Sequence, residues 1–136
     1  MKIIVCLDDR GGMMFNGRRL SRDRILIEDV LKTVNGAKLF IDPYSRLLFD
    51  GVDASVTENA DMLDIASEGD YCFVENKHIK DFLDKIEEIT LYRWNRRYPF
   101  DFELDIVPEK EGFSLFSSEE FKGYSHDVIT KEIFRR

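Results

Sequence analysis

The period of the apolar residues changes part-way along the chain, and this change constrains the fold more than any other feature. As far as residue 86, short apolar runs alternate with segments whose apolar residues recur every three or four positions. The runs are typical of buried strands and the recurring segments of helices. From residue 89 onward, apolar and polar residues alternate as in antiparallel strands. The order predicts an α/β fold with a mixed, mostly parallel sheet, flanking helices and an antiparallel C-terminal hairpin.

Each predicted element ends where its pattern is interrupted. The apolar and alternating runs predict strands over residues 2–7, 37–41, 71–75, 89–94, 101–106, 113–118 and 128–135. Residues 8–21 contain three glycines and no period, so we expect a loop there. Helices are expected after N-caps at Ser21, Asp42, Thr57 and Asn76, ending near Gly36, Gly51, Gly69 and Ile86 respectively.

The composition favours one domain that covers residues 1–136. Hydrophobic residues make up 43% of the chain, and no stretch rich in Pro, Gly or Ser offers a linker. Cys6 and Cys72 each lie in an apolar run, and we expect both to be reduced core residues. The N-terminal apolar run is too short for a signal peptide or a membrane span. We therefore expect a cytoplasmic protein with no membrane partner.

The charge and the missing motifs narrow the function classes. The net charge of −7 disfavours nucleic acid as a partner, unless the cations gather on one face. Neither GxGxxG nor GxxxxGK[ST] occurs, and no serine or cysteine nucleophile signature is present. His78 and His126 have no further ligand residue at metal-binding spacing, so we expect no metal site.

Several short motifs, taken in order, resemble the dihydrofolate reductase family over most of the chain. The opening strand is followed by Gly12-Met13 and by Leu20-Ser21-Arg22-Asp23, which is similar to the family's Leu-Pro-x-Asp. The remaining matches are to the family's helix-to-strand passage, its Phe-Pro stretch and its closing hairpin, at residues 82–94 (FLDKIEEITLYRW), 98–102, 113–121 (FSLFSSEEF) and 124–136 (YSHDVITKEIFRR). The resemblance implies the family's fold, a small heterocyclic ligand and NADPH. If the chain is an enzyme, it implies an oxidoreductase of this class.

The resemblance assigns roles to three side chains. Asp23 is the counterpart of the carboxylate that holds the pterin and helps to route a proton to it. The alternative from the residues alone is that Asp23 complements the dipole of the helix that follows. Ser45 lies where the family binds a cofactor phosphate, and Tyr92 replaces a threonine on the later strand.

Three departures from the family's pattern predict that the chain is not a competent NADPH-dependent dihydrofolate reductase. Glu75-Asn76 replaces a Gly-Gly that lets the cofactor approach the main chain, and a side chain blocks that approach. Asp42 lies where an anion would rest, within residues 41–45 that replace a Gly-Arg-x-Thr phosphate motif. Between Gly51 and the helix expected at Thr57, the family's middle strand and loop are missing.

Arginines are concentrated in two segments that border the site if the resemblance holds. One group is Arg10, Arg18, Arg19, Arg22 and Arg24, and the other is Arg93, Arg96 and Arg97. We take Asn16, Arg18, Arg19, Arg22, Tyr92 and Arg93 as candidate ligand-binding residues for a small anionic or heterocyclic ligand. The alternative is a solvated loop in which the arginines pair with Asp8, Asp9 and Glu28.

Three hypotheses follow. The first is a diverged dihydrofolate-reductase-like protein that keeps part of a ligand pocket near Asp23. The second is an anion- or RNA-binding module, a nuclease-related accessory among the options, that acts through the arginines. The third is a minor reductase that uses a flavin or another hydride donor.

Overall fold

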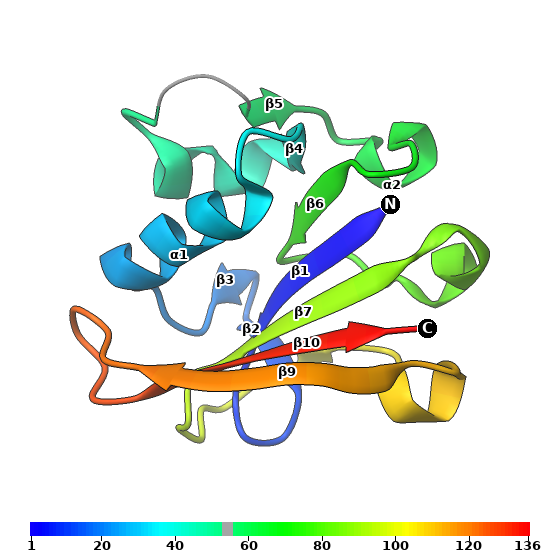
Figure 1. The fold of residues 1–136 in the computed structure, drawn as a ribbon. Helices are drawn as coiled ribbons and strands as arrows, with labels where there is room; N and C mark the ends of the chain where they lie inside the picture. The colour runs from blue at the N-terminus through cyan, green and yellow to red at the C-terminus, as the bar shows by residue number, and fades with distance from the viewer. Residues whose placement is uncertain (53–55) are drawn as a thin grey trace.

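The computed structural model describes residues 1–52 and 56–136 and is built around a seven-stranded sheet (Figure 1). The strand order is β5-β4-β6-β1-β7-β10-β9. The strands are β1 (Lys2–Leu7), β4 (Leu39–Ile41), β5 (Val56–Glu58), β6 (Tyr71–Val74), β7 (Glu88–Arg93), β9 (Ser114–Phe121) and β10 (Ile129–Arg135). All pairings are parallel except those of β10, which runs antiparallel to β7 and β9. The predicted mixed sheet with an antiparallel C-terminal hairpin is confirmed.

A second, three-stranded sheet lies where the sequence predicted only a loop. It contains β2 (Gly12–Phe15), β3 (Arg18–Arg19) and β8 (Phe102–Glu103), in the order β3-β2-β8. Asn16 and Gly17 have φ of 53° and 74°, as a two-residue hairpin turn of type I′ requires. The loop prediction for residues 8–21 is therefore wrong in part. The predicted strand over residues 101–106 is also too long, because its pairing with β2 covers only β8.

The helical segments are shorter than predicted, and several caps differ. They are α1 (Arg24–Val34), α2 (Met62–Ile65) and the 3-10 helices η1 (Pro43–Phe49), η2 (Lys80–Lys85) and η3 (Pro108–Glu111). The prediction that Ser21 caps the first helix is wrong, since Asp23 accepts the backbone N–H groups of Ile25 and Leu26. The predicted helix caps at Thr57 and Asn76 are also wrong.

Two contacts explain these last corrections. Thr57 lies in β5 and pairs with Phe40 of β4, in keeping with the strand preference of β-branched residues. The backbone N–H groups at the start of η2 donate to Asp105, a residue distant in sequence, so Asn76 is not needed as a cap. The sequence predicted that the chain runs almost directly from Gly51 into a helix at Thr57. This prediction is wrong, because the strand β5 begins at Val56. Residues 53–55 lie outside the described part of the chain.

The main sheet separates two hydrophobic clusters. Successive side chains of a strand point to opposite faces, so Ile4 joins the α1 side while Ile3 and Val5 join the other. The α1 side also holds core residues Leu26, Ile27, Val30, Phe73 and Tyr92. The opposite side includes Met62 of α2, Ile86, Phe113 and Phe134. In residues 1–52 and 56–136, no helix is long and apolar enough to cross a membrane.

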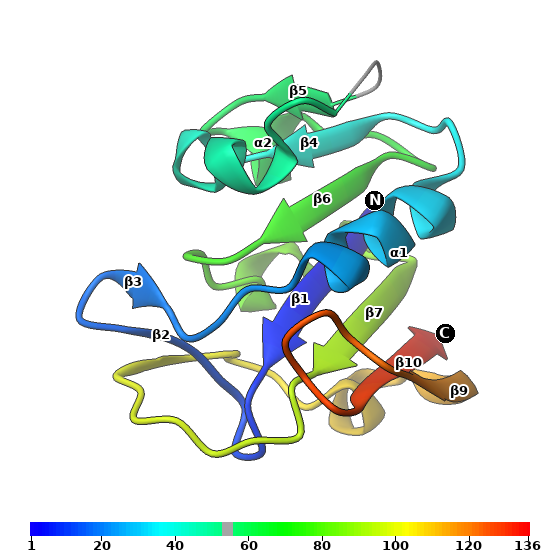
Figure 2. The same cartoon turned by 90° about the vertical axis from the view of Figure 1, so that its left-hand side faces the viewer.

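This arrangement brings four strand ends together. The carboxyl ends of β4, β6, β1 and β7 lie along one edge of the sheet because these strands run parallel. In open α/β sheets, ligands bind at such an edge. The β2–β3 hairpin leaves the end of β1 and lies beyond the arrowhead of β6 (Figure 2). It therefore covers the place where a site is expected.

Candidate functional site

Arg19 of β3 and Glu75, which directly follows β6, form a bidentate ion pair at this edge. Arg19 Nε donates to Glu75 Oε2 at 2.8 Å, and Arg19 Nη2 donates to Oε1 at 3.0 Å. Ser45 Oγ donates to the same Oε1 at 2.6 Å. The hydrogen bond with Glu75 raises the pKa of Arg19 above its ordinary value. A bidentate, charge-assisted pair is stronger than a neutral hydrogen bond and fixes how the two side chains lie relative to each other.

Tyr44 of η1 holds the other side of the Arg19 side chain. The guanidinium carbon lies 4.6 Å from the centroid of the Tyr44 ring, within cation–π distance. The backbone N–H of Arg19 donates to the Tyr44 hydroxyl at 2.9 Å. The β2–β3 hairpin is thus tied to η1 and to the end of β6.

The residues at the position implied for the cofactor do not fit NADPH. Ser45 is fully buried, and its hydroxyl proton is committed to Glu75. Asp42 accepts the Tyr44 N–H at 2.9 Å and pairs with Lys77 at 3.1 Å. Burial raises the pKa of Asp42, but these hydrogen bonds outweigh it, and the pKa is lowered overall. A pyrophosphate here would meet two carboxylates, of Asp42 and Glu75, and no uncommitted donor from Ser45.

Asp23 is the centre of a second polar network. Its side chain is fully covered, and Oδ1 accepts the Ile25 N–H at 2.9 Å within the helix cap. From the 123–126 loop, Tyr124 N donates to Oδ1 at 2.9 Å and Ser125 N donates to Oδ2 at 2.8 Å. Burial raises the pKa of Asp23, but the hydrogen bonds from Tyr124, His126 and Ser125 lower it by more, to well below its usual range.

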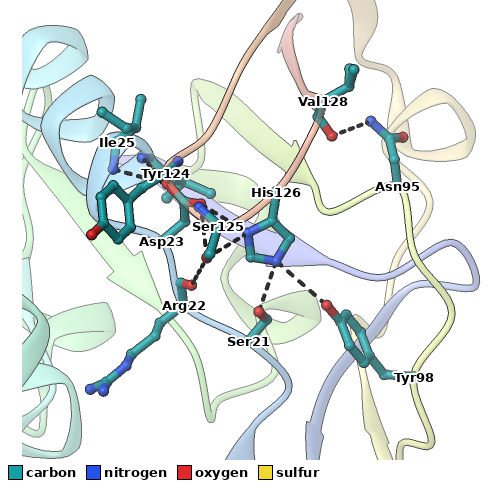
Figure 3. A network of polar contacts seen from close by, with 11 residues as sticks. Ser21, Arg22, Asp23, Ile25, Asn95, Tyr98, Tyr124, Ser125, His126 and Val128 are labelled. Carbon is teal, nitrogen blue, oxygen red and sulfur yellow. Dashed lines mark hydrogen bonds and ion pairs between the residues drawn. The ribbon is translucent and has the colours of Figure 1, made fainter.

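His126 connects Asp23 to Ser21 (Figure 3). Nδ1 of His126 lies 2.9 Å from Asp23 Oδ2, and Nε2 lies 2.9 Å from Ser21 Oγ. The Tyr98 hydroxyl lies 3.5 Å from the same Nε2. The imidazole is buried and stacks on Trp94 with 4.6 Å between ring centroids. Packing against Trp94 therefore fixes the orientation of the imidazole ring.

Three hollows border these networks. A narrow hollow between α1 and the ends of β1, β6 and β7 has about 20 Å³, which is room for a water molecule and not for a heterocycle. A cleft of about 480 Å³ lies between α1 and η1 and is lined by residues that include Arg22, Arg24, Leu31 and Leu48. An open cavity of about 560 Å³ is lined by Arg18, Arg19, Ser21, Arg22 and Tyr44.

The structure brings together only part of the set of candidate ligand-binding residues. Arg18, Arg19 and Arg22 meet at the open cavity. Asn16 lies on the exposed hairpin turn, and its backbone N–H donates to Asp101. Tyr92 and Arg93 lie apart from this group: Tyr92 is fully buried and donates to Asp29 at 2.6 Å, whereas Arg93 pairs with Glu132 on β10.

The described residues do not form the alternative ion pairs between the arginines and Asp8, Asp9 or Glu28. Asp8 accepts backbone N–H groups of Arg10 and Gly12 and is fully buried. Within the described ranges, Arg18 and Arg22 have no carboxylate within 4.0 Å. Their charges remain available to a ligand.

Sequence reasoning missed the partners in both networks. The sequence predicted only that Glu75 blocks a cofactor. The arginine-rich segment that contains Arg19 was a signal that this carboxylate could have an ion-pair partner. His126 and Ser21 are far apart in sequence, so no spacing pattern connects them. The signal for the β2–β3 hairpin was the Asn16-Gly17 dipeptide, which favours a tight turn.

Among residues 1–52 and 56–136, no group of His, Cys, Asp and Glu could hold a metal ion.

Comparison with solved structures identifies the fold. Dihydrofolate reductase from Enterococcus faecalis, complexed with NADP(H) and RAB-propyl, matches with a TM-score of 0.69. The match covers 99% of this chain and 95% of the other, at 7% sequence identity. This chain has a dihydrofolate-reductase-like fold. No family model matches the sequence, and no curated protein does either.

Proposed function

We propose that this dihydrofolate-reductase-like protein binds a small ligand in the cleft beside Asp23 and is not an NADPH-dependent dihydrofolate reductase. The Arg19–Glu75–Ser45 network is the observation that carries the proposal. It fills the implied cofactor position with an ion pair whose carboxylate is 9% exposed. Opening it to admit NADPH leaves Glu75 buried near a phosphate, at a cost of several kcal/mol.

The cleft between α1 and η1 has the character of a small-molecule site. Its volume of about 480 Å³ lies in the range of ligand pockets. Its apolar lining comes from Ile27, Leu31, Leu47, Leu48 and Val52, and its charged lining comes from Arg22, Arg24, Glu28 and Asp50. This combination of an apolar wall and charged groups of both signs suits a small, flat heterocycle with polar groups at its rim. Asp23, whose carboxylate is covered, positions the start of α1 beside the cleft.

A thermal-shift titration with folate and with NADPH tests this function. A ligand at 100 times its dissociation constant stabilises the folded state by about 2.7 kcal/mol. For this chain length that raises the melting temperature by about 10 °C. We expect a shift with folate that is lost in Leu47→Asp, which places a charge at the cleft, and retained in Leu115→Asp on β9. A shift with NADPH alone would contradict the proposal.

A second candidate function is the binding of a small anion at the open cavity. The specific observation is that Arg18 and Arg22 line this cavity without a carboxylate partner in the described part of the chain. The net charge of −7 favours a compact anion over a nucleic acid backbone.

Titration with inorganic phosphate or pyrophosphate at two salt concentrations tests the second candidate. Binding should weaken as salt rises and should be lost when Arg18 and Arg22 are both changed to Ala. The matched control is Arg96→Ala with Arg97→Ala, two exposed arginines that do not line the cavity. An affinity that does not change with salt concentration, or that is kept when Arg18 and Arg22 are changed to Ala, would refute this second candidate function.

A further inference from the structure

Three side chains in this protein have the mutual geometry of an activated serine. Ser21 Oγ lies 2.9 Å from His126 Nε2, and His126 Nδ1 lies 2.9 Å from Asp23 Oδ2. A nucleophile within hydrogen-bond reach of a base, which a third group orients, is the arrangement that nucleophilic catalysis requires. The three come from two separate segments, residues 21–23 and the loop before β10.

The environment selects the tautomer of the neutral imidazole that a general base needs. The Asp23 carboxylate is ionised, since its pKa is lowered, and so it only accepts hydrogen bonds. Nδ1 of His126 therefore carries the proton that it donates to Asp23. In the neutral ring Nε2 then has a free lone pair, which accepts the Ser21 hydroxyl proton.

We propose that Ser21 is a nucleophile that attacks carboxylic esters bearing an anionic group, with His126 as general base and Asp23 as the residue that positions it. This reaction would take place at the open cavity and does not depend on ligand binding between α1 and η1. Ser21 is half-buried and is one of the residues that line this cavity. It also stands where the family's Leu-Pro-x-Asp has a proline, which has no hydroxyl.

The proposed reaction consumes only the ester and one water molecule. Ser21 Oγ forms a bond to the ester carbonyl carbon while its proton passes to His126 Nε2. The tetrahedral intermediate expels the alcohol, which takes that proton from His126, and leaves an ester of Ser21. Water then attacks the same carbonyl carbon and gives a proton to His126. The bond from that carbon to Ser21 Oγ breaks, and His126 returns the proton to Oγ, which releases the carboxylic acid and restores the Ser21 hydroxyl.

The surroundings of Ser21 supply the charge that such a substrate needs. Arg18, Arg19 and Arg22 line the cavity that Ser21 faces, and Arg18 and Arg22 have no carboxylate partner in residues 1–52 and 56–136. The backbone N–H groups of Ser21 and Arg22 also donate to no acceptor in these ranges. Backbone donors beside a nucleophile are the groups that stabilise an oxyanion.

A purely structural role is the competing explanation. His126 also stacks on Trp94, and Ser125 Oγ lies 3.3 Å from its Nδ1. The network would then only fix the 123–126 loop to the start of α1. In that case the Ser21 hydroxyl has no enhanced reactivity, because a serine hydroxyl is a weak nucleophile without a base.

The deciding experiment is to treat the folded protein with a fluorophosphonate probe and to locate the adduct by mass spectrometry. We expect modification at Ser21, absent in Ser21→Ala and unchanged in Ser117→Ala, an exposed serine on β9. In His126→Gln we expect the labelling rate to fall about 100-fold or more. If that variant does not fold, the wild-type adduct still decides the question. No adduct at Ser21 in the folded wild-type protein would overturn the inference.

Two further measurements test the substrate class and the role of Asp23. We expect hydrolysis of p-nitrophenyl hemisuccinate to exceed that of p-nitrophenyl acetate by 10-fold or more, and Arg18→Ala with Arg22→Ala to remove the difference. Equal rates on the two esters would overturn the anionic substrate class while leaving the nucleophile in place. In the part of the chain that the structure describes, the titratable groups within hydrogen-bond distance of the imidazole are Asp23 and Tyr98. We expect Asp23→Asn to shift the pH profile of labelling, and a loss of stability with an unchanged profile would refute the positioning role.

Discussion

Replacing Asp23 by alanine should cost this protein a large part of its stability. The carboxylate accepts the N–H groups of Ile25 and Leu26, and losing such a helix cap costs about 1 kcal/mol. It also accepts hydrogen bonds from Tyr124 N, Ser125 N and His126 Nδ1. Hydrogen bonds to a charged group contribute about 1.5–3 kcal/mol each, but they share one acceptor and do not add fully. We expect a total loss of about 4 kcal/mol and a fall in melting temperature of about 15 °C.

The pH dependence of this effect has a definite sign. The folded pKa of Asp23 is lower than its unfolded value, which is about 3.9. The carboxylate therefore contributes its full stability above about pH 5 and loses it progressively as the pH falls. The difference in free energy of unfolding between wild type and Asp23→Ala should shrink as the pH falls from about 6 to 3.

Urea denaturation followed by tryptophan fluorescence measures both quantities, since Trp94 stacks on His126 beside the network. The matched control is Asp127→Ala, an exposed aspartate in the same part of the chain, which should change stability by less than about 0.5 kcal/mol. A loss below about 1 kcal/mol for Asp23→Ala, or a difference from wild type that grows as the pH falls, would refute the reasoning.

Other substitutions probe the same structure by urea denaturation. Gly123→Ala should destabilise by about 1–3 kcal/mol, because its Cβ would lie 2.6 Å from Asp23 Oδ2, and an unchanged midpoint would contradict this. Tyr92→Phe should cost about 1–2 kcal/mol, since it leaves Asp29 without a 2.6 Å hydrogen bond, and a stabilised variant would count against that bond. Glu75→Gln should cost about 2 kcal/mol, because it leaves a half-buried guanidinium without its carboxylate, and a neutral outcome would show that the pair is not formed in solution.

The sequence predicted the main sheet well because its information is local. The apolar run of residues 2–7 and the alternating residues 128–135 each contain their own strand period, and the order of elements constrains how strands pair. Asp42-Pro43 likewise predicted η1, since a capping side chain and a fixed φ are both local.

The helix boundaries were less predictable because distant residues decide them. Ser21 and Asp23 are both good capping residues, and the choice of Asp23 depends on the 123–126 loop that shares its carboxylate. The start of η2 depends on Asp105 in the same way.

The candidate site was the least predictable part, because it is made of long-range pairs. Arg19 and Glu75 are separated by 56 positions, and Ser21 and His126 by 105. The sequence shows that these residues are present, but only the folded chain brings them within hydrogen-bond distance. Tyr92 was expected to contact a ligand because it matches a family position. In the folded chain its hydroxyl donates to Asp29 on α1 instead.

The central claim is that the chain's own Arg19–Glu75–Ser45 network occupies the implied cofactor position, and calorimetric titration with NADPH tests it most directly. We expect no measurable heat of binding to the wild-type protein at NADPH concentrations up to about 1 mM, which corresponds to a binding free energy weaker than about −4 kcal/mol. Saturable binding with a micromolar dissociation constant would contradict the account.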